Sequence, residues 1–464
     1  KANITAKKVW VGGETVRPAS ITLSLSRYFE GGITEDTGYQ SPAAATLTKP
    51  EDNNNDWGTH TWENQERFYT DQGVQKEYVY KVTESYALTA DKGSFTSNCE
   101  VVDGVYTITN TYTPPTRDYY MKKAWDGGKP RVVTVQLQRK YADEGDNAYI
   151  PMGPGHTLDG VPDAAYGEFS NAKELENWVL HRPNLIRADN TGRAYKYRII
   201  ELSDLSEYGF ISYSVDYNGT EYDAVVTNHY EIPTDGEATV KKVWVNGAEA
   251  NRPDVWFQLW RKTTTGTDDV REKVPGPDPE LAPDLAPIKI NDHVGYEYTF
   301  TDLAKTDKYA NAYTFFVVEG SYDGTNFTAG NPENYELTTT GDSLTLTNSY
   351  VIPTTGTVTA TKEWVNGPAA KPEVWFQLHR KTGTGSWEIV PGAEIKQVPV
   401  APAELKVEWS GLETTDINGN AYEFGVVEGS YKNNTFTAGA PENYTATAQP
   451  SLAITNTYVP PKRE

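Results

Sequence analysis

The chain has 464 residues and a formal net charge of −22 at pH 7. We exclude nucleic acid as a partner, because nucleic-acid binding requires basic patches that a chain this acidic does not favour. The single cysteine, Cys99, excludes an intramolecular disulfide. No apolar run reaches membrane length, which predicts no membrane insertion in this segment.

The composition predicts an all-β chain. It contains 31 Tyr but only two Met, and short alternating apolar runs are separated by Gly, Pro and Asn. Such runs are typical of strands and turns, and little helical periodicity is present. We therefore expect β-sandwiches.

Three short motifs recur four times in the same order. Each set opens with Lys-x-Trp, continues with an apolar stretch that ends in Glu, and closes with Thr-Asn-x-Tyr. An internal period of about a hundred residues indicates tandem domains. With Pro-containing linkers as boundaries, we predict four domains in an elongated array, at 1–115, 116–233, 234–353 and 354–464.

The four repeats differ in their insertions. Repeat 1 has a long one, roughly residues 28–67, with an acidic tract and two tryptophans, Trp57 and Trp62. Repeat 2 has a comparable excursion at 141–190, in which residues 172–180 are predicted as a short helix. Repeats 3 and 4 are close copies of each other, which suits spacer modules. If the chain binds a ligand, we expect recognition in the long insertions, because loops on rigid scaffolds often carry function.

Strand periodicity places three polar residues of each repeat on the apolar side of their strands. Residues i, i+2 and i+4 of a strand share one face, so Lys8 lies on the same face as Ala6 and Trp10. The same alternation selects Lys123 over its neighbour Lys122 in repeat 2, the repeat that departs most from the others. The motif glutamates and asparagines follow the same rule. Isolated charges in a core are costly, so their recurrence needs a reason.

Two interpretations of these residues remain open. One is a structural Lys–Glu ion pair whose hydrogen bonds the Asn completes. The other is a reaction. Burial lowers the pKa of a lysine and raises that of a glutamate, so a neutral amine can attack the Asn carboxamide while a protonated Glu shuttles the proton. Loss of ammonia would leave a Lys–Asn isopeptide bond, and holding the two groups together makes this exchange feasible.

The combined motifs resemble the B-type repeat domains of the collagen adhesin family (CnaB domains), which form the stalks of Gram-positive surface adhesins and pili. The resemblance covers essentially the whole chain as four tandem copies, and it implies that each is an Ig-like, prealbumin-like β-sandwich. In that family a first-strand Lys and a last-strand Asn form an intramolecular isopeptide bond, which an acidic residue on a middle strand promotes. The resemblance implies the pairs Lys8–Asn110 with Glu84, Lys123–Asn228 with Glu201, Lys242–Asn348 with Glu319, and Lys362–Asn456 with Glu428.

The resemblance also implies a function: a stalk segment of a bacterial cell-surface adhesin or pilus-like protein. We expect it to be extracellular, monomeric, and attached to the cell wall through another segment of an exported parent chain. The alternative is a ligand-binding adhesin region that contacts a host extracellular-matrix protein or glycan through the insertions of repeats 1 and 2. Six scattered histidines form no zinc-binding spacing. We therefore expect no metal, no cofactor and no enzyme activity beyond a single self-modification.

Overall fold

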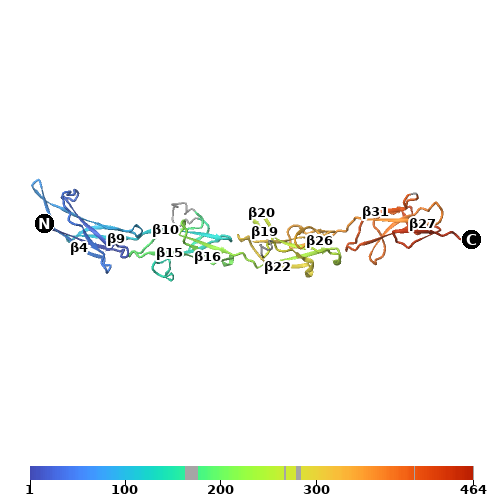
Figure 1. The fold of residues 1–464 in the computed structure, drawn as a ribbon, viewed down its shortest axis with the longest axis horizontal. Helices are drawn as coiled ribbons and strands as arrows, with labels where there is room; N and C mark the ends of the chain where they lie inside the picture. Colours follow the sequence, from blue (N-terminus) through green and yellow to red (C-terminus); the bar gives the residue numbers. More distant parts are fainter. Residues whose placement is uncertain (162–175, 266–267, 278–283, 402, 463–464) are drawn as a thin grey trace. The chain divides into compact units, whose positions relative to one another are not determined.

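The computed structural model describes residues 1–161, 176–265, 268–277, 284–401 and 403–462. Regular structure in this part of the chain consists of β-strands and short 3-10 turns, which confirms the all-β fold class. The strands are coloured along the chain in Figure 1.

The chain forms two compact units, residues 1–231 with 308–310 and residues 232–307 with 311–464. Each unit contains two hydrophobic cores. Every core lies between two sheets, because alternating residues of facing strands are buried together. The sheets therefore form four sandwich-like units, which we call the first to fourth sandwich in chain order.

The first sandwich pairs a four-stranded sheet with a three-stranded one. The larger sheet has the order β4-β1-β9-β8 and the smaller the order β3-β2-β7, with a separate β5-β6 hairpin. The strands are β1 (Ala2–Val11), β2 (Ser20–Tyr28), β3 (Ala45–Thr48), β4 (Asp56–Gln65), β5 (Phe68–Asp71), β6 (Val74–Glu77), β7 (Val79–Ser85), β8 (Ser94–Val102) and β9 (Val105–Thr113).

The second sandwich has two four-stranded sheets. One has the order β14-β10-β17-β16, and in the other β11 pairs with β12, β13 and β15. The strands are β10 (Thr116–Asp126), β11 (Val133–Tyr141), β12 (Ile150–Pro151), β13 (His156–Leu158), β14 (Val179–Ile186), β15 (Tyr195–Glu201), β16 (Phe210–Asp216) and β17 (Ala224–Tyr230).

The third sandwich pairs sheet β22-β18-β26-β25 with sheet β20-β19-β23-β24, in which β21 also pairs with β19. Its strands are β18 (Gly236–Val245), β19 (Trp256–Thr265), β20 (Asp268–Lys273), β21 (Ile288–Lys289), β22 (Glu297–Leu303), β23 (Thr314–Tyr322), β24 (Phe327–Ala329), β25 (Tyr335–Leu337) and β26 (Thr345–Tyr350).

The fourth sandwich has the same plan as the third. Sheet β31-β27-β35-β34 faces sheet β29-β28-β32-β33, in which β30 also pairs with β28. Its strands are β27 (Gly356–Val365), β28 (Trp375–Thr382), β29 (Glu388–Ile389), β30 (Lys396–Gln397), β31 (Lys406–Leu412), β32 (Tyr422–Lys432), β33 (Thr435–Ala438), β34 (Tyr444–Ala446) and β35 (Ala453–Tyr458).

Two expectations about the insertions need correction. Trp57 and Trp62 are buried in the core of the first sandwich, because β4 is a regular strand that pairs with β1. These tryptophans are therefore core residues and not part of an exposed recognition loop. The helix predicted at 172–180 is also wrong where the chain is described: residues 176–178 form a bend and turn, and β14 begins at Val179. Residues 172–175 lie outside the described part.

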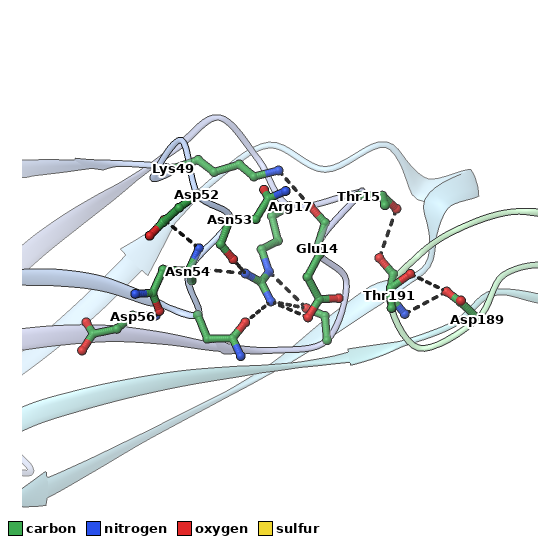
Figure 2. A network of polar contacts seen from close by, with 12 residues as sticks. Glu14, Thr15, Arg17, Lys49, Asp52, Asn53, Asn54, Asp56, Asp189 and Thr191 are labelled. Carbon is green, nitrogen blue, oxygen red and sulfur yellow. Dashed lines mark hydrogen bonds and ion pairs between the residues drawn. The ribbon is translucent and has the colours of Figure 1, made fainter.

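The first two sandwiches meet through hydrogen bonds, and Figure 2 shows the one from the Thr15 hydroxyl to the Thr191 carbonyl, at 3.0 Å. The amides of Gly13 and Thr15, in the loop after β1, donate to the carbonyls of Asn190 and Thr191 at 2.8 and 3.0 Å. Behind this loop lies Arg17, which is only 6% exposed. Its guanidinium donates to the Gly12 carbonyl and to the loop that precedes β4. Arg17 thus ties the contacting loop to its own sandwich.

The third and fourth sandwiches meet in the same way. The amides of Gly247 and Ala248, after β18, donate to the carbonyls of Ile417 and Asn418 at 3.0 and 2.7 Å. Gly247 has a φ of +67°, a left-handed conformation that a glycine adopts without strain. The carbonyls belong to a turn that Asp416 organises by accepting the amides of Asn418 and Asn420, at 2.9 Å each.

Candidate functional site

The first and last strands of each sandwich bring the predicted lysine and asparagine together. In the first sandwich β1 runs parallel to β9, with Trp10 opposite Asn110. Lys8 lies two residues before Trp10 and therefore shares its face. The same register recurs in the other three sandwiches, as Trp125 opposite Asn228, Trp244 opposite Asn348, and Trp364 opposite Asn456.

The glutamates come from the opposite sheet. Glu84 lies on β7, Glu201 on β15, Glu319 on β23 and Glu428 on β32. Each of these strands lies next to the second long strand of its sandwich. A carboxyl group from one sheet thereby crosses the core to an amine and a carboxamide on the other sheet.

Each glutamate forms an ion pair with the lysine of its own sandwich. The Nζ–Oε2 distance is 3.1 Å for Lys8–Glu84 and 2.9 Å for Lys362–Glu428, and Lys242 also pairs with Glu319. Lys123 and Glu201 are 3.9 Å apart. The structure therefore brings the lysine and the glutamate of each sandwich together.

The asparagines complete the triads in three of the four sandwiches. The Nδ2 group of Asn228 donates to Glu201 at 2.8 Å, that of Asn348 to Glu319 at 2.5 Å, and that of Asn456 to Glu428 at 2.6 Å. In the first sandwich neither polar side-chain atom of Asn110 has a hydrogen-bond partner. Glu84 of this sandwich forms an ion pair with Lys8 but no hydrogen bond with Asn110.

The triads are almost completely shielded from water. The four lysine side chains are 0% exposed, and the four asparagines are at most 3% exposed. Burial lowers the pKa of Lys8 and of Lys123 to about 8, although the paired carboxylate opposes the shift. It also lowers the pKa of Lys242 and Lys362.

Burial acts on the carboxyl group in the opposite direction. It raises the pKa of Glu201, and the hydrogen bond from Asn228 and the charge of Lys123 only partly counter this. A lower lysine pKa and a higher glutamate pKa both favour transfer of the proton from the amine to the carboxyl group. The site can therefore approach the neutral amine and neutral acid that nucleophilic attack needs.

The carboxamide oxygens of all four asparagines are buried without a hydrogen-bond partner, namely Oδ1 of Asn110, Asn228, Asn348 and Asn456. An unpaired buried acceptor costs about 1–3 kcal/mol. An ionised glutamate has no proton to donate to this oxygen, whereas a protonated one does. The unpaired oxygen is thus an acceptor that a proton donor in the core could satisfy.

The tryptophan of each Lys-x-Trp motif covers the amine, a role that our sequence analysis did not assign. The Nζ atom lies over the indole ring in every sandwich, at 4.5 Å for Lys8, 3.9 Å for Lys123, 4.8 Å for Lys242 and 4.3 Å for Lys362. The sequence contained the signal for this role, because the tryptophan follows the lysine by two residues and residues i and i+2 of a strand share a face. The ring excludes water and attracts the ammonium form.

The second sandwich departs from the others, as its sequence does. The Lys123 amine donates to the carbonyl of Ala124 at 2.6 Å, and its distance to Glu201 is the longest of the four. It also donates to the Val226 carbonyl at 3.2 Å, a contact that the first sandwich shares, because Lys8 donates to the Ile108 carbonyl at 3.3 Å. A lysine held by backbone carbonyls is less free to approach the carboxamide.

Within the described residues, no group of three His, Cys, Asp or Glu side chains could hold a metal ion. No helix in the same part of the chain is long and apolar enough to cross a membrane. Cys99 is a free, exposed cysteine on β8.

No protein-family model matches the chain, and no curated protein matches it. Solved structures do match. Two B repeat units of the collagen binding protein of Staphylococcus aureus are 19% identical, with 99% of each chain covered and a TM-score of 0.30. They are the kind of domain that the sequence motifs resemble.

Two pilus proteins also match. The pilus adhesin SpaC of Lactobacillus rhamnosus GG is 14% identical, with 96% of this chain and 56% of that chain covered and a TM-score of 0.22. A minor pilin of Streptococcus agalactiae is 11% identical, with 49% of this chain and 98% of that chain covered and a TM-score of 0.18.

Proposed function

We propose that the chain is a stalk segment of a bacterial cell-surface adhesin in which each sandwich is closed by a Lys–Asn isopeptide bond. The bonds join Lys8 to Asn110, Lys123 to Asn228, Lys242 to Asn348 and Lys362 to Asn456. The observation that carries this proposal is the fourfold recurrence of a buried Lys–Glu–Asn triad across the first and last strands. The proposal takes the four domains to be 1–115, 116–233, 234–353 and 354–464, the boundaries predicted from the linkers.

The reaction begins with transfer of the lysine proton to the glutamate within the buried pair. The neutral Nζ attacks the Cγ atom of the asparagine, while the protonated glutamate donates a hydrogen bond to Oδ1. Glutamate then moves the amine proton to Nδ2, the C–Nδ2 bond breaks, and ammonia leaves. The departing ammonia takes up the proton that the glutamate first accepted and leaves as ammonium. The product is one new amide, and the glutamate returns to its ionised form, so it promotes the reaction without entering the product.

Proximity of the amine and the carboxamide accelerates this otherwise slow amide exchange. Groups held in reacting geometry can reach effective molarities of about 10⁵–10⁸ M. The core also excludes the water that would compete as a nucleophile. The reaction runs once per domain, so the chain is not an enzyme in the sense of turnover.

The bond position suits a protein that carries tension. Because β1 and β9 are parallel neighbours, a force that enters at Lys1 and leaves at Thr113 would cross from Lys8 to Asn110 through a covalent bond. Residues 9–109 would then lie outside the loaded path. We infer the same path in the other three sandwiches, where the first and last strands are also parallel neighbours. An extracellular location fits this use.

Intact-protein mass under denaturing conditions tests the proposal. The expected mass is lower than the sequence mass by one ammonia per sandwich, four in total. Fragmentation of a proteolytic digest should recover four branched peptides, one for each Lys–Asn pair. A mass equal to that of the unmodified sequence would leave only buried ion pairs and would overturn the proposal.

A further inference from the structure

A groove on the second sandwich belongs to none of the triads. Its volume is about 670 Å³, within the range of about 300–1,000 Å³ that small-molecule sites occupy. A hollow beside Trp364 on the fourth sandwich has about 300 Å³. Four tyrosines line the groove: Tyr119, Tyr149, Tyr197 and Tyr217. Flat aromatic faces beside polar groups are a common feature of binding sites.

The groove carries excess positive charge in a chain of net charge −22. Its two acids are already paired, Asp223 with Arg117 and Asp146 with Lys140. Two further cations line it, Lys196 and Arg198. Lys196 is exposed. Arg198 donates from Nε to the Gln138 side-chain oxygen at 2.8 Å, and its guanidinium lies 4.1 Å from the centre of the Tyr149 ring. Neither cation forms a salt bridge within the described residues. The groove therefore suits an anionic ligand.

The floor of the groove holds a buried polar atom without a partner. Tyr119 is only 2% exposed, and its hydroxyl forms no hydrogen bond. The charges of Arg117 and Asp223, together with Tyr149 and Tyr217, act on this hydroxyl, which places it among the groups that line the groove. A buried hydroxyl without a partner is unfavourable, and a ligand hydroxyl would satisfy it.

Two of the groove residues, Tyr119 and Lys196, have no counterpart in the other three sandwiches. Counted from the triad lysine, the position of Tyr119 holds Ile4, Ala238 and Val358 in the other sandwiches. Counted from the triad glutamate, the position of Lys196 holds Val79, Thr314 and Glu423, and that of Arg198 holds Lys81, Phe316 and Gly425. Only the second sandwich thus has a phenol at this core position and a lysine at the position of Lys196, whereas the first sandwich also has a cation, Lys81, at the position of Arg198. Folding alone does not require this, since three sandwiches form without it.

An extended peptide is disfavoured as the occupant. Peptides commonly bind by adding a strand to a free sheet edge, and β15 pairs only with β11. However, the Tyr217 hydroxyl accepts a hydrogen bond from the Ile199 amide at 3.1 Å and donates one to the Ile199 carbonyl at 3.3 Å. Tyr217 thereby occupies the backbone groups that an added strand would need.

We propose that this groove binds an acidic oligosaccharide through a sugar carboxylate. Lys196 and Arg198 bind the carboxylate, the tyrosine rings contact the faces of the sugar rings, and the Tyr119 hydroxyl pairs with a sugar hydroxyl. Charge-assisted bonds to the carboxylate supply much of the affinity. The groove lies partly in the excursion of repeat 2, through Asp146 and Tyr149. It is independent of the isopeptide bonds.

Titration of the full chain with sialyllactose and with a hyaluronan oligosaccharide tests the proposal. Lactose, which lacks the acidic sugar, and an oligoglutamate peptide are the comparison ligands. At least one acidic oligosaccharide should bind, with lactose and the peptide weaker by about tenfold or more, the value of one lost charged hydrogen bond. Equal binding of lactose, stronger binding of the peptide, or no binding of either acidic oligosaccharide would overturn it.

Variants with matched controls locate the site. Lys196→Glu should weaken binding about tenfold or more, whereas Lys432→Glu, the same change at an exposed lysine of the fourth sandwich, should leave it unchanged. Tyr119→Phe removes only the hydroxyl and should weaken binding several-fold. Tyr335→Phe is its control, because Tyr335 has a buried, unpartnered hydroxyl outside the groove. Unchanged affinity in both groove variants would also overturn the proposal.

Discussion

Replacement of Glu319 by glutamine separates the chemistry of a triad from its packing. Glutamine has nearly the same shape but cannot accept and release the proton, so the third sandwich should fold without its Lys242–Asn348 bond. The mass of the Glu319→Gln chain should then be lower than its own sequence mass by three ammonia molecules and not four. Asn348→Ala is the matched variant, because it also prevents the bond but keeps the Lys242–Glu319 ion pair.

The stability loss follows from the length of chain that the bond closes. Lys242 and Asn348 are 106 residues apart (348 − 242). If the bond restricts the unfolded chain as a disulfide does, its loss costs about 5 kcal/mol. At about 4 °C per kcal/mol for a domain of this size, Asn348→Ala should lower the melting temperature of the third sandwich by about 20 °C. Glu319→Gln should cost about 3–5 kcal/mol more, because Lys242 remains buried without its counter-charge.

Differential scanning calorimetry of the full chain, followed by mass spectrometry of the same samples, measures both effects. The transitions of the other three sandwiches provide an internal reference, since their triads are unchanged. Full loss of four ammonia molecules from Glu319→Gln would refute the assignment of the carboxyl group as promoter. A melting temperature of Asn348→Ala equal to that of the parent chain would refute the entropic argument.

Three further predictions address the other sandwiches. Lys123→Ala should retain one ammonia more than the parent by intact mass, whereas Lys122→Ala should react fully because its amine faces away from the triad. The reactive form holds one proton per Lys–Glu pair, and that proton leaves Lys8 near its pKa of about 8. The rate of bond formation in the first sandwich should therefore fall above pH 8. Mass spectrometry at intervals after refolding of unreacted chain measures this rate. A rate that keeps rising above pH 8 would show that the glutamate need not be protonated. Arg17→Ala should raise hydrogen exchange at the Gly13 amide by about tenfold, the equivalent of about 1.4 kcal/mol, and unchanged exchange would show that Arg17 does not hold the loop.

The local sequence pattern was sufficient to predict which residues of each triad face the core. The alternation of β1 and β9 places Lys8 and Asn110 inward whatever the neighbouring strands are, because a side-chain period of two is a property of the strand itself. The same rule separated Lys123 from Lys122. The all-β class followed from composition and turn residues for a similar reason, since these are short-range preferences.

Insertions were less predictable because their roles depend on distant partners. Trp57 and Trp62 looked like loop residues, yet pairing of β4 with β1 buries them, and their sequence separation hides that pairing. The helix expected at 172–180 gave way at its C-terminal end to β14, because pairing with β10 overrides a weak helical preference.

The sequence by itself determined the fold class, the four repeats and which lysine, glutamate and asparagine face each core, because all of these follow from local period and motif order. Only the tertiary structure decided that the triad atoms meet, since the carboxyl group arrives from the opposite sheet. It also decided the groove, where Tyr119 on β10 meets Tyr149 and Tyr217 from segments about 30 and 100 residues away. Such contacts between distant segments depend on how two sheets pack, which no local pattern encodes.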